Sequence, residues 1–206
     1  MFARSTRVDG RPSSVEAAVA HIRDAVMPDV LETDGCVGLS VLVDRVSGCC
    51  ILTTAWRAAE ALQAADARLR PHLERVAAQL GGLREDEDWE IAVFHRDHTS
   101  RPGACVRTVR VQVEPELVEH GIDLYRMVLL PRIEEFEGFC SASLLVDRDS
   151  GHVVSSVTFD SHEAMRRTRS LAAVVREEGS TEASGEILDV EEFDLALAHL
   201  HVPELA

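Results

Sequence analysis

The chain has 206 residues, a formal net charge of −15 and 46% apolar residues. This length allows one or two domains, and the apolar share is enough for a buried core in either case. The negative charge would repel a phosphate backbone or an anionic membrane surface, so we expect neither nucleic acid nor membrane as a partner. Lysine and asparagine are both absent, which excludes Schiff-base chemistry and a papain-like Cys-His-Asn arrangement.

The five cysteines include no Cys-x-x-Cys pair, and the first residues lack the apolar run of a signal peptide. Both observations predict a cytoplasmic protein whose thiols are free and mostly buried. No apolar stretch approaches the roughly 20 residues that a membrane span requires. We therefore expect a soluble protein.

The chain repeats itself at a constant offset of 103 residues. Arg4 pairs with Arg107, and the run Leu-Val-Asp-Arg occurs at 42–45 and again at 145–148. The two copies align without gaps, including the residues that indicate turns and helices. This indicates a tandem duplication of one domain-sized module. The expected parts are a first module at 1–96, a linker at 97–103 and a second module at 104–206.

Each copy opens with a stretch in which apolar residues alternate with arginines and other polar residues, at 3–9 and at 104–113. A period of two predicts a strand with one exposed face. A helix is expected next. In the first copy Ser13 and Glu16 have the spacing of a capping box, which predicts Ser13 as the N-cap. In the second copy Pro115 stands near the first helical position.

Both of these helices contain a proline at the same late position, Pro28 and Pro131. Because proline lacks a backbone N–H and clashes with the preceding turn, we expect a kink or a restarted final turn there. Gly35 and Gly138 follow a few residues later and are predicted to end the two helices.

Apolar runs on either side of a Ser-Gly turn then follow in each copy, which is typical of an antiparallel hairpin. The runs are apolar on both faces, so both faces of these strands are expected to be covered. The four expected strands are 37–44 and 49–56 in the first copy and 141–147 and 152–159 in the second.

A second helix is predicted after each hairpin. In the first copy it covers 57–80, with a break near Pro71, and in the second copy it covers 161–178 and ends at Gly179. A fourth strand is expected to complete each copy, at 89–95 and at 193–199.

The order β-α-β-β-α-β therefore occurs twice, which is the ferredoxin-like arrangement. Two such sheets in one chain can pack their open faces together and leave the helices outside. We expect an α+β fold of two tandem ferredoxin-like modules packed sheet to sheet as an intramolecular α/β barrel. The internal pair would replace a homodimer, so we expect a monomer with a pseudo-dimeric core and leave further homo-oligomerisation open.

Several residues resemble the pattern of the antibiotic biosynthesis monooxygenase family within the dimeric α/β-barrel superfamily. Trp56 closes the third strand, Glu60 and Ala61 start the next helix, Pro71 and His72 follow, and Gly35 precedes the second strand. The resemblance implies a small cofactor-free monooxygenase that acts on aromatic polyketides, or a haem-binding or haem-degrading protein. It also implies a pocket between the helices and the sheet of a module.

The same resemblance implies which residues of the first module line that pocket. Three of these residues are assigned to catalysis and three to ligand binding. In catalysis, an arginine or histidine would stabilise an oxyanion. The catalytic candidates are His72, Trp56 and Arg7, and the ligand-binding candidates are His21, Asp66 and Leu69. Asp66 lies near the position at which the haem-degrading branch carries its histidine, and that branch also needs an asparagine, so haem degradation is disfavoured while haem binding stays open.

The first copy is favoured as the site because the second lacks its polar groups. Trp56, His72 and His21 correspond to Phe159, Val175 and Leu124 in the second copy. We predict no metal site and no cofactor. The sequence has two histidine-containing clusters, at 95–98 and at 199–201, and neither supplies three ligands at a known metal spacing.

Two functions stay open at this stage. The first is a cofactor-free monooxygenase that orients an aromatic substrate and excludes water. The second is a non-catalytic ligand-binding or interaction module. Both share one expected partner, a small apolar or aromatic ligand, and they differ in whether turnover occurs.

Overall fold

The computed structural model describes residues 1–200 of the chain, and within them neighbouring strands are hydrogen-bonded in the order β1-β3-β2-β8-β5-β7-β6-β4. The chain divides into two compact units. Unit 1 comprises residues 1–89 and the end of β8 from Asp194, and unit 2 comprises Glu90–Phe193. The α+β class and the two ferredoxin-like modules are confirmed, because each unit holds a hairpin, a first strand and helices in the expected order.

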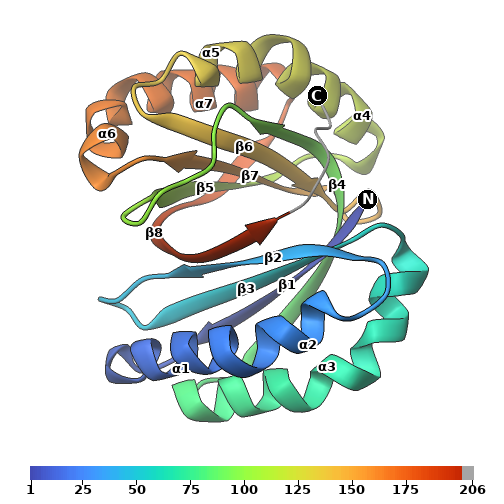
Figure 1. The fold of residues 1–206 in the computed structure, drawn as a ribbon. Coiled ribbons are helices and arrows are strands. Elements are labelled where there is room, and N and C mark those ends of the chain that lie inside the picture. The colour runs from blue at the N-terminus through green and yellow to red at the C-terminus, as the bar shows by residue number, and fades with distance from the viewer. Residues whose placement is uncertain (201–206) are drawn as a thin grey trace. The chain divides into compact units, whose positions relative to one another are not determined.

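In unit 1 the helices cover one face of the sheet (Figure 1). The strands are β1 (Phe2–Asp9), β2 (Cys36–Val43), β3 (Cys49–Trp56) and the start of β4 (Arg84–Arg96). The helical elements are η1 (Pro12–Ser14), α1 (Val15–His21), η2 (Ile22–Val26), α2 (Met27–Leu31) and α3 (Ala59–Leu80).

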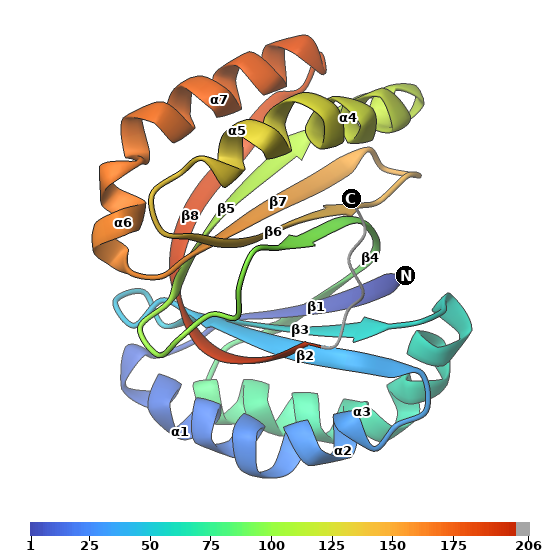
Figure 2. The same cartoon turned by 45° about the horizontal axis from the view of Figure 1, so that its top comes forward.

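Unit 2 repeats this plan, with its helices on one face of its own sheet (Figure 2). The strands are β5 (Cys105–Gln112), β6 (Phe139–Val146), β7 (His152–Phe159) and the start of β8 (Glu186–Leu200). The helical elements are η3 (Pro115–Leu117), α4 (Val118–Leu124), η4 (Tyr125–Leu129), α5 (Leu130–Glu134), α6 (His162–Arg167) and α7 (Arg169–Glu182).

Both predicted hairpins are antiparallel, and both first strands pair with the second strand of the hairpin. The equivalent turns are built alike. Asp44 accepts a hydrogen bond from the Val46 amide, and Asp147 accepts one from the Asp149 amide. Gly48 has a φ of +88°, a conformation that glycine adopts without a Cβ penalty. The repeated turn chemistry therefore fixes the same strand register in both units.

The start of the first helix differs from the prediction. Ser13 lies inside the single 3₁₀ turn η1, and neither it nor Ser14 makes a side-chain cap, so the capping-box prediction is wrong. The interruption at the prolines is confirmed and takes the form of a π-turn in each unit, η2 and η4. The wider turn precedes Pro28 and Pro131, whose missing N–H and bulky ring are incompatible with regular i→i−4 bonding.

The fourth strands are longer than expected, and the second helices differ from the prediction in where they break and end. α3 continues unbroken through Pro71, so the predicted break there is wrong, and it ends at Leu80 before Gly81, whose φ is +78°. In unit 2 the helix breaks at Thr168 instead and then runs through Gly179 to Glu182, so the predicted end at Gly179 is wrong. A single glycine inside a helix weakens it without ending it when neighbouring residues continue the hydrogen bonding.

Each unit buries its own apolar core between helices and sheet. Because β4 and β8 each contribute residues to both units, the units do not follow the chain order, and the module limits at 1–96 and 104–206 stay a prediction. Within residues 1–200, no helix has both the length and the apolar character needed to cross a membrane.

Candidate functional site

The space between α3 and the sheet of unit 1 is almost filled. The cavity there has a volume of about 10 Å³, and a cavity needs about 10–15 Å³ to hold a single water. Three of the predicted site residues, Trp56, Asp66 and Leu69, line it together with Arg4 and Thr6. No molecule larger than water has room at this place without movement of the side chains around it.

Two other predicted residues lie outside this cavity. Arg7 projects from the face of β1 opposite to Arg4, because side chains alternate along a strand, and it contacts Asp9. His21 ends α1, and its Nε2 is buried without a hydrogen-bond partner among the described residues. The structure therefore separates Arg7 and His21 from Trp56, Asp66 and Leu69.

His72, the sixth predicted residue, connects two helices. Its Nε2 lies 2.7 Å from Oδ2 of Asp29 in α2, and Nη2 of Arg68 lies 3.4 Å from Oδ1 of the same carboxylate. The hydrogen bond with His72, and after it the one from Arg68, holds the pKa of Asp29 below its ordinary value. This geometry gives His72 a part in holding α3 against α2.

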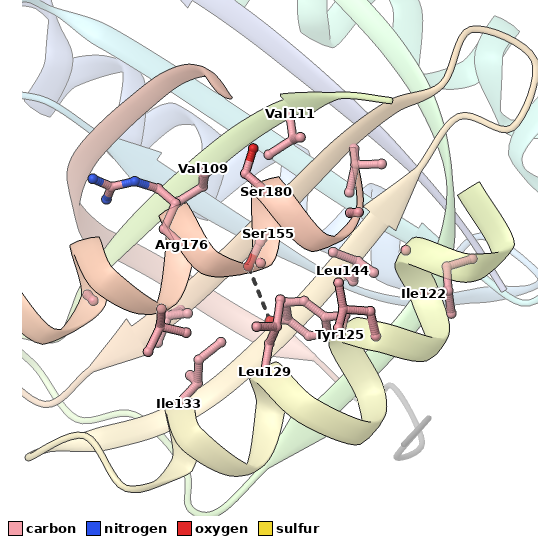
Figure 3. Close-up of a pocket in the computed structure, with 18 of the residues that line it drawn as sticks. Val109, Val111, Ile122, Tyr125, Leu129, Ile133, Leu144, Ser155, Arg176 and Ser180 are labelled. Atoms are coloured by element: carbon pink, nitrogen blue, oxygen red, sulfur yellow. Dashed lines mark hydrogen bonds between the residues drawn. The ribbon is translucent and has the colours of Figure 1, made fainter. Parts of the chain in front are cut away.

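Unit 2 contains a much larger cavity, which we call the second-module cavity. Its volume is about 120 Å³, and it lies between the first helical segment (α4, η4, α5), α7 and the helix-facing sides of β5, β6 and β7 (Figure 3). Most of its wall is aliphatic. Six of the apolar side chains are Val109, Val111, Ile122, Leu129, Ile133 and Leu144.

Two hydroxyl groups form a polar spot on this apolar wall. Oγ of Ser155 in β7 donates to the phenol oxygen of Tyr125 in η4 at 3.1 Å. Burial raises the pKa of Tyr125 to about 12, and the bond from Ser155 opposes that shift. At neutral pH the phenol is therefore protonated and available as a hydrogen-bond donor to a bound molecule.

The arginines are the only charged side chains among the residues that line this cavity, Arg107 from β5 and Arg176 from α7. Arg107 is 4% exposed, and its guanidinium carbon lies 5.5 Å from the ring centre of Phe159. Nη2 of Arg107 donates to the carbonyl oxygen of Met165 at 2.7 Å and to Oε1 of Glu192 at 3.0 Å. The cavity is thus apolar with a cationic part of its wall.

The second-module cavity exists because α7 carries smaller residues than α3 at equivalent positions. The three replacements at the offset of 103, from first module to second, are Leu69 to Ala172, Val76 to Gly179 and Leu80 to Ala183. The three larger residues are buried in the core of unit 1. At Gly179 the space is taken by Leu129, whose Cδ1 would lie 2.7 Å from an added Cβ. The replacement of Leu69 by Ala172 removes apolar carbon atoms from the wall and leaves space there.

The sequence interpretation favoured the first copy because it retains more polar groups, and it missed Arg107, Ser155 and Gly179. A signal for them was present in the duplication. A buried helix stripe that changes from large to small residues between two copies of one module indicates space in the second copy. The informative comparison was therefore side-chain volume at paired positions, in addition to polarity.

Unit 2 also brings together His98, Cys140 and Asp160, with possible ligand atoms within 4.8 Å of one another. His98 Nε2 lies 3.1 Å from Oδ1 of Asp160, and Cys140 Sγ donates to the same oxygen at 3.5 Å. Burial, followed by the nearby carboxylate of Asp160, raises the pKa of Cys140 to about 12. The thiol is thus protonated, and hydrogen bonds with Asp160 account for the cluster.

The fold is similar to that of several solved proteins, one of which is described as a ferredoxin-fold protein related to antibiotic biosynthesis monooxygenases. A candidate monooxygenase from Lactobacillus acidophilus NCFM superposes with a TM-score of 0.71 at 11% identity, covering 97% of this chain and 96% of its own. An anthrone oxidase-like protein superposes with a TM-score of 0.70 at 14% identity, covering 100% and 95%. A haem-degrading enzyme from Listeria monocytogenes gives 0.56 at 9% identity, covering 95% and 99%.

No established family profile matches the sequence, yet close relatives exist. The chain belongs to the family of two uncharacterised proteins of Mycobacterium tuberculosis (strain ATCC 25618 / H37Rv), Rv2557 and Rv2558. It is 50% identical to Rv2557 over 205 residues, which cover 100% of this chain and 92% of the relative. It is 48% identical to Rv2558 over 206 residues, which cover 100% and 87%.

Proposed function

We propose that this protein binds a small apolar molecule, about the size of one aromatic ring, in the second-module cavity. The observation that carries the proposal is the cavity itself, with a volume of about 120 Å³ and a largely aliphatic wall. An apolar cavity of comparable size, about 150 Å³, stays dry and binds benzene in another protein. Binding there removes apolar ligand surface from water.

The position of the cavity supports entry of a ligand. Leu129, Arg176 and Ser180 line it and are partly exposed, so the cavity has an opening to solvent beside these side chains. A ligand larger than one ring would extend through this opening. Tyr125 and Ser155 supply the hydrogen bonds that orient it, a division typical of small-molecule sites.

Cofactor-independent oxygenation of the bound molecule is the second candidate function. It is supported by the names of fold relatives, an anthrone oxidase-like protein and a candidate monooxygenase. In such a reaction a ring CH₂ becomes a C=O, one dioxygen is consumed and one water is released. Arg107 would stabilise the oxyanion that develops on the substrate, and the aliphatic wall would exclude bulk water.

Haem does not fit this cavity as well as a small ring does. Its volume is well below the roughly 300–1,000 Å³ of pockets for drug-sized molecules. Its lining residues include no histidine, cysteine or methionine that would ligate iron. The cytoplasmic location and the monomeric state, both expected from the sequence, stay predictions.

Calorimetric titration with ethylbenzene tests the binding proposal. We expect saturable binding to the wild type and its loss in Ala172→Leu, which restores the side chain that Leu69 provides in the first module. His72→Ala is the matched control in the other unit and should bind as the wild type does. Absence of binding to the wild type, or equal binding to Ala172→Leu, would refute the proposal.

The oxygenation candidate is tested separately with a dioxygen electrode. Wild-type protein is incubated with anthrone, which carries a ring CH₂, and the rate of dioxygen consumption is compared with that of Ala172→Leu. Consumption that depends on the open cavity supports catalysis. Ethylbenzene binding without any dioxygen consumption leaves the protein as a non-catalytic binding module.

A further inference from the structure

Arg4 and Arg107 occupy equivalent positions in the two modules, on the helix-facing side of β1 and β5. In unit 1 every nitrogen of the Arg4 guanidinium is paired. Nη1 donates to Oδ1 of Asp66 at 2.7 Å, and Nε and Nη2 donate to the two carboxylate oxygens of Asp88 at 2.6 and 2.7 Å. This arrangement shows what a complete set of partners looks like for this arginine.

Arg107 lacks one of these partners. Its Nε and Nη2 bind Glu192 and the carbonyl oxygen of Met165. Its Nη1 is buried and has no hydrogen-bond partner within residues 1–200. The side chain is also more deeply buried than that of Arg4, with 5% against 18% side-chain exposure.

The reason lies at a single pair of positions. Asp66, the partner of Nη1 in unit 1, is replaced by Arg169 at the offset of 103. Arg169 binds the same carboxylate as Arg107, with its Nη2 2.6 Å from Oε2 of Glu192. Two guanidinium groups therefore share one carboxylate, which leaves an excess of positive charge beside the cavity.

A second arginine of the cavity wall shows the same deficit. Nε of Arg176 is buried without a hydrogen-bond partner in the described part of the chain. A buried N–H of a charged group gains most from a charged acceptor, since such hydrogen bonds are about twice as strong as those between neutral groups. No aspartate or glutamate is among the residues that line the cavity.

We infer that the second-module cavity binds a small apolar carboxylic acid, whose carboxylate accepts a hydrogen bond from Nη1 of Arg107 while its apolar part fills the aliphatic space. The ligand carboxylate takes the part that Asp66 has in the first module. This inference rests on the proposed function and adds the acidic group to it. A one-ring aryl acid such as phenylacetate has the required size and charge.

Calorimetry with three probes separates the inference from the proposed function: phenylacetate, the near-isosteric phenylacetamide and ethylbenzene. Wild-type protein should bind phenylacetate at least about tenfold more tightly than phenylacetamide, because a charge-assisted hydrogen bond in a buried site contributes at least that much. Ethylbenzene binding with no preference for the acid would overturn the inference and leave the proposed function standing. Failure of all three probes to bind would overturn both.

Arg169→Asp is the most informative variant, because it gives Nη1 of Arg107 the intramolecular partner that Arg4 has. We expect it to remove the preference for phenylacetate, to leave ethylbenzene binding unchanged and to fold as well as the wild type. Arg166→Asp, at an exposed position of α6, makes the same change in net charge and should retain the preference. Arg107→Gln provides a second test. A preference for the acid that persists in both Arg169→Asp and Arg107→Gln would overturn the inference.

Discussion

The hydroxyl groups of Tyr125 and Ser155 lie 3.1 Å apart on the wall of the second-module cavity. Their equivalents in the first module are Ile22 and Leu52, both fully buried. One module thus places a hydrogen-bonded pair where the other packs two aliphatic side chains. Since the two backbones follow the same plan, this difference in chemistry comes from the side chains alone.

Removal of the phenol oxygen should weaken unit 2. Tyr125→Phe leaves the hydroxyl of Ser155 without its partner, so we expect the free energy of unfolding to fall by about 0.5–1.5 kcal/mol. Urea denaturation of Tyr125→Phe, Ser155→Ala and the double variant measures the coupling between the two groups. Purely additive effects would contradict a direct interaction.

The ionisation of Tyr125 can be followed without interference because it is the only tyrosine of the chain. Its pKa is raised by burial to about 12, against about 10 in the unfolded chain. The folded state therefore retains the phenol proton to a higher pH than the unfolded chain does. Its contribution to the free energy of unfolding is complete below pH 10 and is lost as the pH rises toward 12. Absorbance of tyrosinate against pH measures this, and a midpoint near 10 in the folded protein would contradict it.

Filling the cavity should stabilise the fold. Ala172→Leu adds apolar contacts in existing space, and we expect the free energy of unfolding to rise by about 0.5–2 kcal/mol. The reverse change in the first module, Leu69→Ala, opens a cavity in a filled core and should lower it by about 2–5 kcal/mol. Chemical denaturation of both variants makes the comparison, and similar effects of the two would argue against a difference in packing between the modules.

Gly138 should tolerate substitution far less well than Gly121. Gly138 has a φ of +73°, and an added Cβ would lie 2.6 Å from Cβ of Ala164. Gly121 lies within helix α4, and an added Cβ there meets nothing within 4 Å. We expect Gly138→Ala to lower the melting temperature and Gly121→Ala to raise it. In Gly121→Ala the free energy of unfolding should increase by about 0.5–1 kcal/mol. A loss of stability in Gly121→Ala would disprove this assignment.

His98 should titrate above its ordinary pKa of 6.5. The hydrogen bond with Asp97, followed by that with Asp160, raises the pKa of this imidazole. The stability that the charged pair contributes is complete below the pKa of the unfolded chain and is lost as the pH rises through the higher pKa of the folded state. NMR titration of His98 in the wild type and in Asp160→Asn checks this, and a pKa at or below 6.5 in the wild type would be incompatible with it.

The elements of the fold were predictable because their causes are local. The alternation in 3–9, the Ser-Gly turn before Cys49 and the position of Pro28 act over a few residues, and each appears in the structure where the pattern indicates. The capping box at Ser13 failed because a competing 3₁₀ turn around Pro12 uses the same residues. Local signals are reliable where only one local structure satisfies them.

The candidate site was less predictable because a cavity is a difference in volume among side chains from several elements. The family resemblance assigned Arg7 and His72 to a pocket, whereas strand alternation turns Arg7 away from α3, and His72 is hydrogen-bonded to Asp29. Neither contact is encoded at a fixed spacing. Residues far apart in the chain have to meet before such a pairing exists.

By itself the sequence determined the duplication, the order of strands and helices, and hence the α+β class of this protein, because a repeated pattern of apolar periods and turns acts locally in each copy. Only the tertiary structure decided which module holds the larger cavity. Ala172 leaves space only where α7 faces β5 and β7 across the cavity, and Nη1 of Arg107 is unpaired where Arg169 stands in place of the Asp66 of the other module. Packing and pairing depend on what surrounds a side chain, which the order of residues along the chain does not state.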